Sequence, residues 1–327
     1  MRFLYFTDTH IRGNSPRGRL DDICETLKNK LSEINDIINK ENIDVVLHGG
    51  DFFDRPDISP SIVREFAAFF QKSGKIIYGI AGNHDMYGHN PATIGRTMVG
   101  LLDGVKVIKL IDSQQPILLK DDKATILLSG QPYIYDIDYK DKYKQYYVIS
   151  KPHNIDFSIH MVHGMLLDKK IFDGAAYTLL DDILDTEADI TLSGHYHSGF
   201  GIKIINNKYF INPGSLVRMT SSITEIERWP SVAILDISRE NGIVANIVKL
   251  KSAKPGDEVL DRGYIEQEQF KKHRLASFFQ EIGSAGEIKK LDLYSIIQQV
   301  ANNENIDENI KKEALKRIAD AERYMET

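Results

Sequence analysis

Several side chains that can bind metal ions stand where runs of apolar residues end. The stretch Leu47-His48-Gly49-Gly50-Asp51 follows the apolar, β-branched run 43–46. This pattern predicts a buried strand that ends in a glycine loop, with Asp51 at the edge where open α/β sheets place ligand sites. A carboxylate there can bridge two cations, because each of its oxygens can reach one ion. An ordinary aspartate in a turn explains this stretch equally well. The residues at the ends of the other predicted strands must distinguish the two interpretations.

Four other predicted strands end in the same way, in a cluster of side chains that can ligate a metal. Polar residues of these types are rare in a protein core, so five such clusters at five strand ends indicate one shared site. The predicted metal ligands are Asp8 and His10 after the run 2–7, Asp51 after 43–46, Asn83 after 75–80, His163 at the end of 155–163, and His195 and His197 after 189–192.

The donor types and their spacing indicate the kind of metal. Carboxylate, imidazole and amide donors together suit borderline divalent ions such as manganese, iron or zinc better than calcium or magnesium. The pairs Asp8-x-His10 and His195-x-His197 each place two side chains on one side of an extended loop, where both can bind one ion.

The remaining histidines fit the pattern less well. His160 lies on the opposite face of its predicted strand from His163, which favours His163 as the ligand. His48 falls inside its strand and is predicted to be buried and hydrogen-bonded, whereas His89 and His153 are predicted to lie in surface loops.

The periodicity of the chain predicts a layered α/β fold. Apolar residues recur at helical spacing over about 21–40, and Ser59-Pro60 opens a second helix. Successive βα units imply a sheet with right-handed crossovers. Short strands at 105–109, 115–119 and 124–128 are predicted to begin the second half of a sandwich. Tyrosines spaced four apart over 133–147 favour a helix with one aromatic face packed, rather than a platform for stacking bases.

Composition limits the class of protein. The 327 residues carry a net charge of −6, so any role in nucleic-acid binding must depend on local patches of cations. A single cysteine, Cys24, excludes an internal disulfide and a cysteine zinc site. The short apolar N-terminus does not resemble a signal sequence, and no run is long enough for a membrane span. We therefore expect a cytoplasmic protein with no membrane partner.

The composition changes after Lys251, where Lys254-Pro255-Gly256-Asp257 is typical of a linker. We expect a catalytic domain over 1–250, followed over 251–327 by the linker and a charged helical region. Two short apolar stripes near 293–300 and 310–321 predict helices there. Such a helical pair buries little by itself, so it must pack either on its own domain or on a partner.

Five motifs together resemble the calcineurin-like metallophosphoesterase superfamily, over roughly the first 215 residues. The resemblance implies a two-layer β-sandwich flanked by helices, with a helical C-terminal appendage here and two divalent ions per chain. Manganese is the first choice, with iron, zinc or magnesium as alternatives. One ion would bind Asp8, His10, Asp51 and His197, and the other Asp51, Asn83, His163 and His195. The motifs are Asp8-x-His10, Gly50-Asp51-x-x-Asp54, Gly82-Asn83-His84-Asp85, His163-Gly164 and Gly194-His195-x-His197.

Two catalytic roles follow from the same motifs. His84 adjoins a ligand but is free to protonate a leaving oxygen as a general acid. The Asp54 carboxylate is expected to hold His84 in its protonated form, because an adjacent carboxylate raises an imidazole pKa. Arg55 would contact the phosphate, although a surface ion pair explains it equally well.

Within the superfamily the chain most resembles the SbcD-type nuclease subunits. The features are Gly-Asp-Phe-Phe-Asp-Arg-Pro from Gly50, and Asn212-Pro213-Gly214-Ser215 followed by Arg218. Some of those nucleases have histidine where this chain has Asp54. The resemblance implies a DNA nuclease in a repair or recombination complex, an SbcC-like coiled-coil ATPase as partner, and a homodimer. Alternatives are a small-molecule or cyclic-nucleotide phosphodiesterase and, less in keeping with the full ligand set, a non-catalytic scaffold.

DNA contacts would come from cations near the predicted metal site. The basic loop beside His10 is the first candidate, although such a loop can also simply be solvated. Phosphate binding needs only such local cations, so the acidic net charge is no obstacle. The predicted nucleic-acid contacts are Arg12, Arg17, Arg19, Arg55 and Arg218, helped by Lys169 and Lys170.

Overall fold

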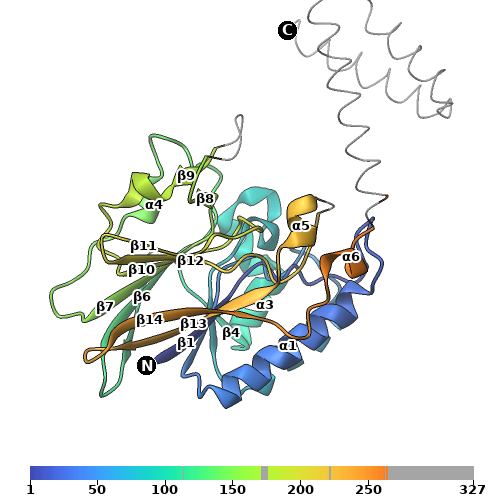
Figure 1. Cartoon of the computed structure of the whole chain (residues 1–327), viewed down its shortest axis with the longest axis horizontal. Coiled ribbons are helices and arrows are strands. Elements are labelled where there is room, and N and C mark those ends of the chain that lie inside the picture. The colour runs from blue at the N-terminus through green and yellow to red at the C-terminus, as the bar shows by residue number, and fades with distance from the viewer. Residues whose placement is uncertain (113, 171–175, 221, 262, 264–327) are drawn as a thin grey trace, which may run out of the picture. The chain divides into compact units, whose positions relative to one another are not determined.

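A computed structural model describes residues 1–112, 114–170, 176–220, 222–261 and 263. Two six-stranded sheets face each other, and a two-stranded sheet lies beside them (Figure 1). This arrangement confirms the predicted α/β sandwich flanked by helices. The predicted helical segments near 293–300 and 310–321 lie outside the described residues, and the boundary at residue 250 stays a prediction.

The first sheet has the order β14-β13-β1-β2-β3-β4. Its four N-terminal strands run parallel, and β13 and β14 extend it in antiparallel fashion. The strands are β1 (Arg2–Phe6), β2 (Val45–His48), β3 (Ile77–Gly79), β4 (Ile108–Leu110), β13 (Ser231–Ser238) and β14 (Gly242–Lys249).

The second sheet has the order β11-β12-β10-β7-β6-β5, with β6, β7, β10 and β12 parallel. The pairs β5–β6 and β11–β12 are antiparallel. The strands are β5 (Ile117–Lys120), β6 (Thr125–Gln131), β7 (Phe157–Val162), β10 (Ile190–Ser193), β11 (Gly201–Ile205) and β12 (Lys208–Asn212), and the small third sheet pairs β8 (Leu166–Leu167) with β9 (Thr178–Leu179).

The helices begin where the sequence places capping residues. Asp22 caps α1 through its carboxylate, and Pro60 occupies the first turn of α2. Both helices confirm the predicted ones. The helices are α1 (Ile23–Lys40), α2 (Pro60–Lys72), α3 (Met98–Gly104), α4 (Lys144–Tyr147), α5 (Ile223–Glu227) and α6 (Gly256–Val259), with 3-10 turns η1 (Asn83–Asp85), η2 (Tyr87–His89), η3 (Pro91–Arg96) and η4 (Leu180–Ile183).

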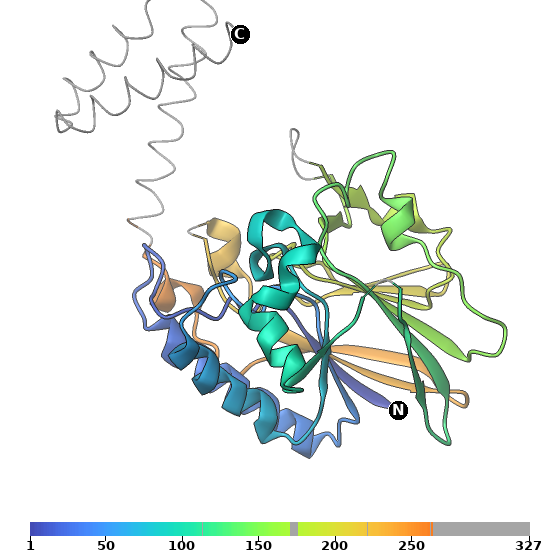
Figure 2. The same cartoon turned by 180° about the vertical axis from the view of Figure 1, so that it is seen from behind.

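Alternating residues of each strand serve two different cores, as strand geometry requires. Leu4 and Phe6 of β1 pack with the apolar faces of α1, α2 and α3. Phe3 and Tyr5, on the other face, pack between the two sheets. A third cluster covers the outer face of the second sheet and includes Tyr147. The first sheet is therefore covered by helices on its outer side, where Figures 1 and 2 show α1, and the second sheet is covered by loops with the short α4 and η4.

Two local predictions are wrong. The strand predicted at 105–109 is β4, which pairs in parallel with β3 and so belongs to the first sheet. The predicted tyrosine helix is reduced to α4, and Tyr135 and Tyr139 are exposed. Side-chain hydrogen bonds override the helical pattern there, because the buried Asp138 accepts from Tyr147 and from the N–H of Met165.

The parallel strands bring all the predicted ligands to one edge of the molecule. Strands β1, β2 and β3 of the first sheet and β7 and β10 of the second end at the residues singled out by the sequence. Hydrogen bonds join the two sheets at this edge, including that from His163 Nδ1 to the Gly49 carbonyl at 2.7 Å. Among the described residues, none of the helices is long and apolar enough to cross a membrane.

Candidate metal centre

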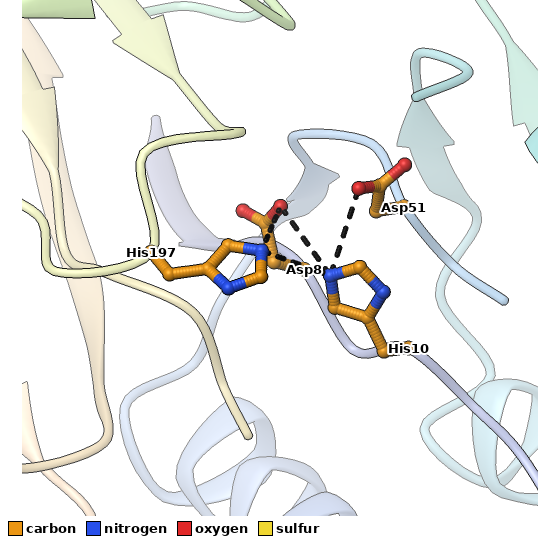
Figure 3. A group of neighbouring side chains, drawn as sticks. All are labelled: Asp8, His10, Asp51 and His197. Carbon is orange, nitrogen blue, oxygen red and sulfur yellow. Dashed lines mark hydrogen bonds and ion pairs between the residues drawn. The ribbon is translucent and has the colours of Figure 1, made fainter. Parts of the chain in front are cut away.

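Four side chains from three strand ends meet in a first cluster, shown in Figure 3: Asp8, His10, Asp51 and His197. Each offers a ligand atom, and these atoms all lie within 4.8 Å of one another. His10 Nε2 and His197 Nε2 are 3.0 Å apart, and Asp8 Oδ1 is 3.6 Å from His197 Nε2. The two imidazole nitrogens and the carboxylate oxygens converge on one small volume.

A second cluster shares Asp51 with the first and adds His163 and His195. His163 Nε2 lies 3.4 Å from Asp51 Oδ2 and 3.2 Å from the side-chain oxygen of Asn83. Because His163 Nδ1 donates to a backbone carbonyl, Nε2 is the nitrogen that faces the cluster. The structure thus brings together all seven predicted metal ligands, in the two groups that the family resemblance implies.

The two oxygens of Asp51 have different surroundings. Oδ1 accepts the backbone N–H of His84 at 2.9 Å. Oδ2 is buried without a hydrogen-bond partner in the described part of the chain, 3.6 Å from His10 Nε2 and 3.4 Å from His163 Nε2. One oxygen therefore stands between both clusters. The other oxygen accepts a hydrogen bond from the His84 loop, and the expectation that each oxygen reaches its own ion stays a prediction.

The backbone at the ligands is strained. Asp8, His10, Asp51 and His195 all have positive φ angles, 54°, 40°, 54° and 68°, which side-chain-bearing residues rarely adopt. Such a conformation costs of order 1–3 kcal/mol per residue and is typical of sites where the surroundings fix a functional side chain. The coincidence of strain with four predicted ligands supports a shared role for them.

Burial controls the charges in both clusters. It lowers the pKa of His10 well below its usual value and that of His195 to about 3, so both rings are neutral and can offer a lone pair. Burial also lowers the pKa of His163, but the adjacent Asp51 outweighs it and raises that pKa to about 9. Asp51 therefore favours positive charge at this point, and a divalent cation between the same groups would supply it.

This donor set fits a pair of divalent ions. The unpartnered Asp51 Oδ2 lies between two groups of imidazole and carboxylate atoms, and Asn83 adds an amide oxygen. Buried polar atoms that lack partners are rare in native proteins and indicate a missing ion or water. Oxygen and imidazole donors without thiolates suit manganese, iron or zinc.

His84 stands at the exposed rim of the site, above the buried ligands. Its Nδ1 donates to the backbone carbonyl of Asp54 at 2.8 Å, which leaves Nε2 free. The Asp54 carboxylate lies within 4.8 Å of a His84 ring nitrogen but forms no hydrogen bond to it in the described part of the chain. That carboxylate instead pairs with Arg12 at 3.3 Å and lies 4.0 Å from His10 Nδ1.

Asp85 is a site residue that the sequence analysis did not assign. It is fully buried, and its carboxylate accepts the backbone N–H groups of Phe52, Phe53 and Gly82. Burial, followed by the nearby Asp51, raises its pKa to about 7. It ties the Asp51 loop to the Asn83 loop. The sequence feature that could have indicated this role is the position of Asp85 at the end of the Gly-Asn-His-Asp motif.

The structure separates the five predicted DNA contacts into two groups. Arg17 is exposed, Arg55 has 64% of its side chain exposed, and Arg12 lines a cavity of about 430 Å³ with Arg55 and Asp54. Arg19 and Arg218 are different, because both guanidinium groups are buried and donate to backbone carbonyls. Those two arginines are not available on the surface.

The other histidines lie where they were predicted. His48 is buried, stacks on Phe52 and lies 3.2 Å from the Thr9 hydroxyl. His160 is also buried and contacts Ser129 and the Tyr146 carbonyl rather than the metal clusters.

Residues 1–199 match the family model of the calcineurin-like phosphoesterases, so the chain belongs to that family. Members bind divalent metals, and the family implies a metal-dependent phosphoesterase. No curated protein matches the chain.

Two of the similar solved structures illustrate how distant such likenesses are. One crystal structure aligns over 76% of this chain and 98% of its own, at 11% identity and a TM-score of 0.45. The NAD nucleotidase NadN of Haemophilus influenzae aligns over 76% of this chain and 49% of its own, at 13% identity and a TM-score of 0.40. Likeness at this level does not indicate a substrate.

Proposed function

We propose that this phosphoesterase is a DNA nuclease and the nuclease subunit of an SbcCD-like complex. The observation that carries the proposal is the contrast between buried ligands and an exposed rim. His84 is open to solvent, and its ring is held by Asp54, next to Arg55 and the 430 Å³ cavity. A rim with a proton donor and exposed cations suits an extended polyanion, whose neighbouring phosphates can lie along it.

The residues of the site have two separate roles in the proposed reaction, metal binding and proton donation. Asp8, His10, Asp51 and His197 would hold one ion, and Asp51, Asn83, His163 and His195 the other. Two bound ions would neutralise the phosphate charge and lower the pKa of a bound water. The Asp54 carbonyl orients the His84 ring, so that Nε2 can donate a proton to the leaving oxygen.

The choice of DNA within the phosphoesterases is supported by the sequence motifs shared with SbcD-type subunits. The same resemblance supports an SbcC-like coiled-coil ATPase as partner, a homodimer and manganese as the metal. The helical part of the region 251–327 is the proposed docking segment for the ATPase. Deleting 285–327 should preserve manganese-dependent cleavage of short single strands and abolish co-purification with the ATPase. An insoluble or inactive truncated chain would instead assign this region to the catalytic core.

The decisive experiment compares substrates under matched metal conditions. The full chain is incubated with end-labelled linear DNA, with bis-p-nitrophenyl phosphate and with cyclic nucleotides, in manganese and in EDTA. We expect manganese-dependent cleavage of DNA and of the aryl diester, both lost in EDTA. Cleavage of cyclic nucleotides with no action on DNA would replace the nuclease by the small-molecule phosphodiesterase.

A further inference from the structure

Residues 215–218 lie between two loops that carry predicted metal ligands. The backbone N–H of Ser215 donates to the His197 carbonyl at 2.9 Å, and Ser215 Oγ lies 2.9 Å from the Asp8 carbonyl oxygen. The N–H of Leu216 donates to the Thr7 carbonyl at 3.0 Å. The position of this segment therefore helps to set where Asp8 and His197 stand relative to each other.

Four consecutive carbonyl oxygens of this segment accept hydrogen bonds from three cationic side chains, which we name the cation clamp: Arg19, Lys30 and Arg228. Arginine and lysine donors make strong, charge-assisted bonds, so the segment is held at every residue. The contacts are Arg228 Nη1 to Ser215 at 2.6 Å, Lys30 Nζ to Leu216 at 2.8 Å, Arg228 Nη2 to Val217, and Arg19 Nη1 to Arg218 at 2.7 Å.

Burying the three side chains of the cation clamp costs free energy. Lys30 is 2% exposed and forms no ion pair with a carboxylate in the described part of the chain, whereas Arg19 and Arg228 pair with Asp21 and Glu225. Burial first, and the neighbouring arginines second, lower the pKa of Lys30 well below its usual value. Burying an ammonium group that has no carboxylate partner costs free energy. Stability alone therefore does not explain a lysine here.

The apolar surroundings of Lys30 reinforce this point. Leu27, Leu31 and Ile34 of the same helix are buried in the core between α1 and the first sheet. The amine crosses this layer to reach Leu216, which is 186 positions away in the sequence. A side chain with no hydrogen bond to offer would pack there, but it would leave the Leu216 carbonyl without this donor.

We infer that the cation clamp is a positioning device for the metal centre. By holding the carbonyls of 215–218, it presets Asp8 and His197 for a divalent ion before the ion binds. The inference depends on the metal binding of the family and on the ligand set, and it does not depend on DNA as the substrate. Failure of the nuclease proposal would leave it intact.

Lys30→Met tests this directly, because it keeps the volume and removes the donor to Leu216. Calorimetric titration of the metal-free full-length protein with MnCl₂ measures the affinity of the two sites. We expect one of the two binding steps to weaken by about 10-fold to 100-fold, the range seen when supports of metal ligands are lost. The metal-free variant should still unfold in one cooperative transition, so that a weaker binding step reports the placement of the ligands rather than loss of the fold.

Arg239→Gln is the matched control. Arg239 forms a partly exposed ion pair with Asp156 at 2.9 Å. Arg239 comes directly after β13. The pairing of Asp236 with Arg2 places this end of β13 beside the start of β1, whereas Asp8 follows the end of β1. Manganese affinity should not change in this variant. Weaker manganese binding in the control as well would show that any lost cation has the same effect, and it would overturn the inference.

Arg228→Lys provides a second variant that keeps the charge but cannot bind two carbonyls with the same fork. We expect it to fold and to bind manganese more weakly than the unmodified protein in the same step. Unchanged manganese affinity in either Lys30→Met or Arg228→Lys would overturn the inference.

Discussion

The Nε2 atoms of His10 and His197 lie 3.0 Å apart, although the two residues are 187 positions apart in the sequence. They come from different sheets, since His10 follows β1 and His197 follows β10. Asp8 Oδ1 lies 3.9 Å from His10 Nε2 and 3.6 Å from His197 Nε2. Two nitrogens this close can bind one cation, and the carboxylates beside them favour positive charge at that point.

Asp51→Asn should abolish hydrolysis of every phosphodiester while the fold is retained. Only Asp51 belongs to both clusters, so its loss should lower metal occupancy at both sites rather than at one. Elemental analysis and bis-p-nitrophenyl phosphate hydrolysis measure the two effects. Asp185→Asn, which removes an exposed carboxylate paired with Lys144, is the control and should change neither. Two metals per chain in Asp51→Asn would contradict the shared role.

His84→Ser should lower turnover by about 100-fold to 10,000-fold, as expected for loss of a general acid, with the metal content unchanged. The deoxyribose alkoxide of DNA is a poor leaving group and needs the proton more than nitrophenolate does. The loss should therefore be larger on DNA than on the aryl diester. His153→Ser removes an exposed loop histidine and should have no effect. Equal losses on both substrates would assign His84 a different role.

The exposed arginines at the rim should control DNA affinity through salt. Arg17→Ala and Arg55→Ala should each weaken DNA binding uniformly across sequences and reduce the slope of log affinity against log salt by about 1. Binding titrations in EDTA at several salt concentrations measure the slope without cleavage. Arg239→Gln, which also removes a partly exposed cation, should leave the slope unchanged. Unchanged slopes in both rim variants would remove these contacts from the nuclease proposal.

The ligands could be predicted from sequence because each stands at the end of a strand, and parallel strands align their carboxyl ends. The contacts that Asp54 and Arg218 form could not be predicted in this way. Arg218 donates to the carbonyl of Lys254, which is 36 positions away, and to that of Arg228. Nothing in the motif around Arg218 distinguishes a surface cation from one that turns into the core.

The same limit applies to Asp51. Its place at a strand end was predictable, but the hydrogen bond that Oδ1 accepts from the His84 N–H was not, because His84 follows the next strand. The tyrosine segment failed for a related reason. Its four-residue spacing describes a helix, whereas the buried Asp138 organises the chain through contacts with Tyr147, Thr178 and Met165. Tertiary hydrogen bonds therefore decided what local periodicity could not.

Gly50→Ala should weaken one metal site through a steric effect. Gly50 has a φ of +103°, and a Cβ there would lie 2.3 Å from His163 Nδ1, so the ring or the loop must move. Gly242→Ala is the matched control, since Gly242 has a φ of +67° and no heavy atom within 4 Å of the added Cβ. Both variants should lose roughly 1–2 kcal/mol of stability from the left-handed backbone.

Only Gly50→Ala should also lose manganese affinity, because only there does the new methyl group displace a predicted ligand. Chemical denaturation measures the stability loss that the two variants share, and titration with MnCl₂ measures the difference between them. The weakened binding step should be the one that involves His163 and His195, the second cluster. Equal manganese affinity in the two variants would mean that His163 can move freely, and the ring would then no longer be a fixed ligand.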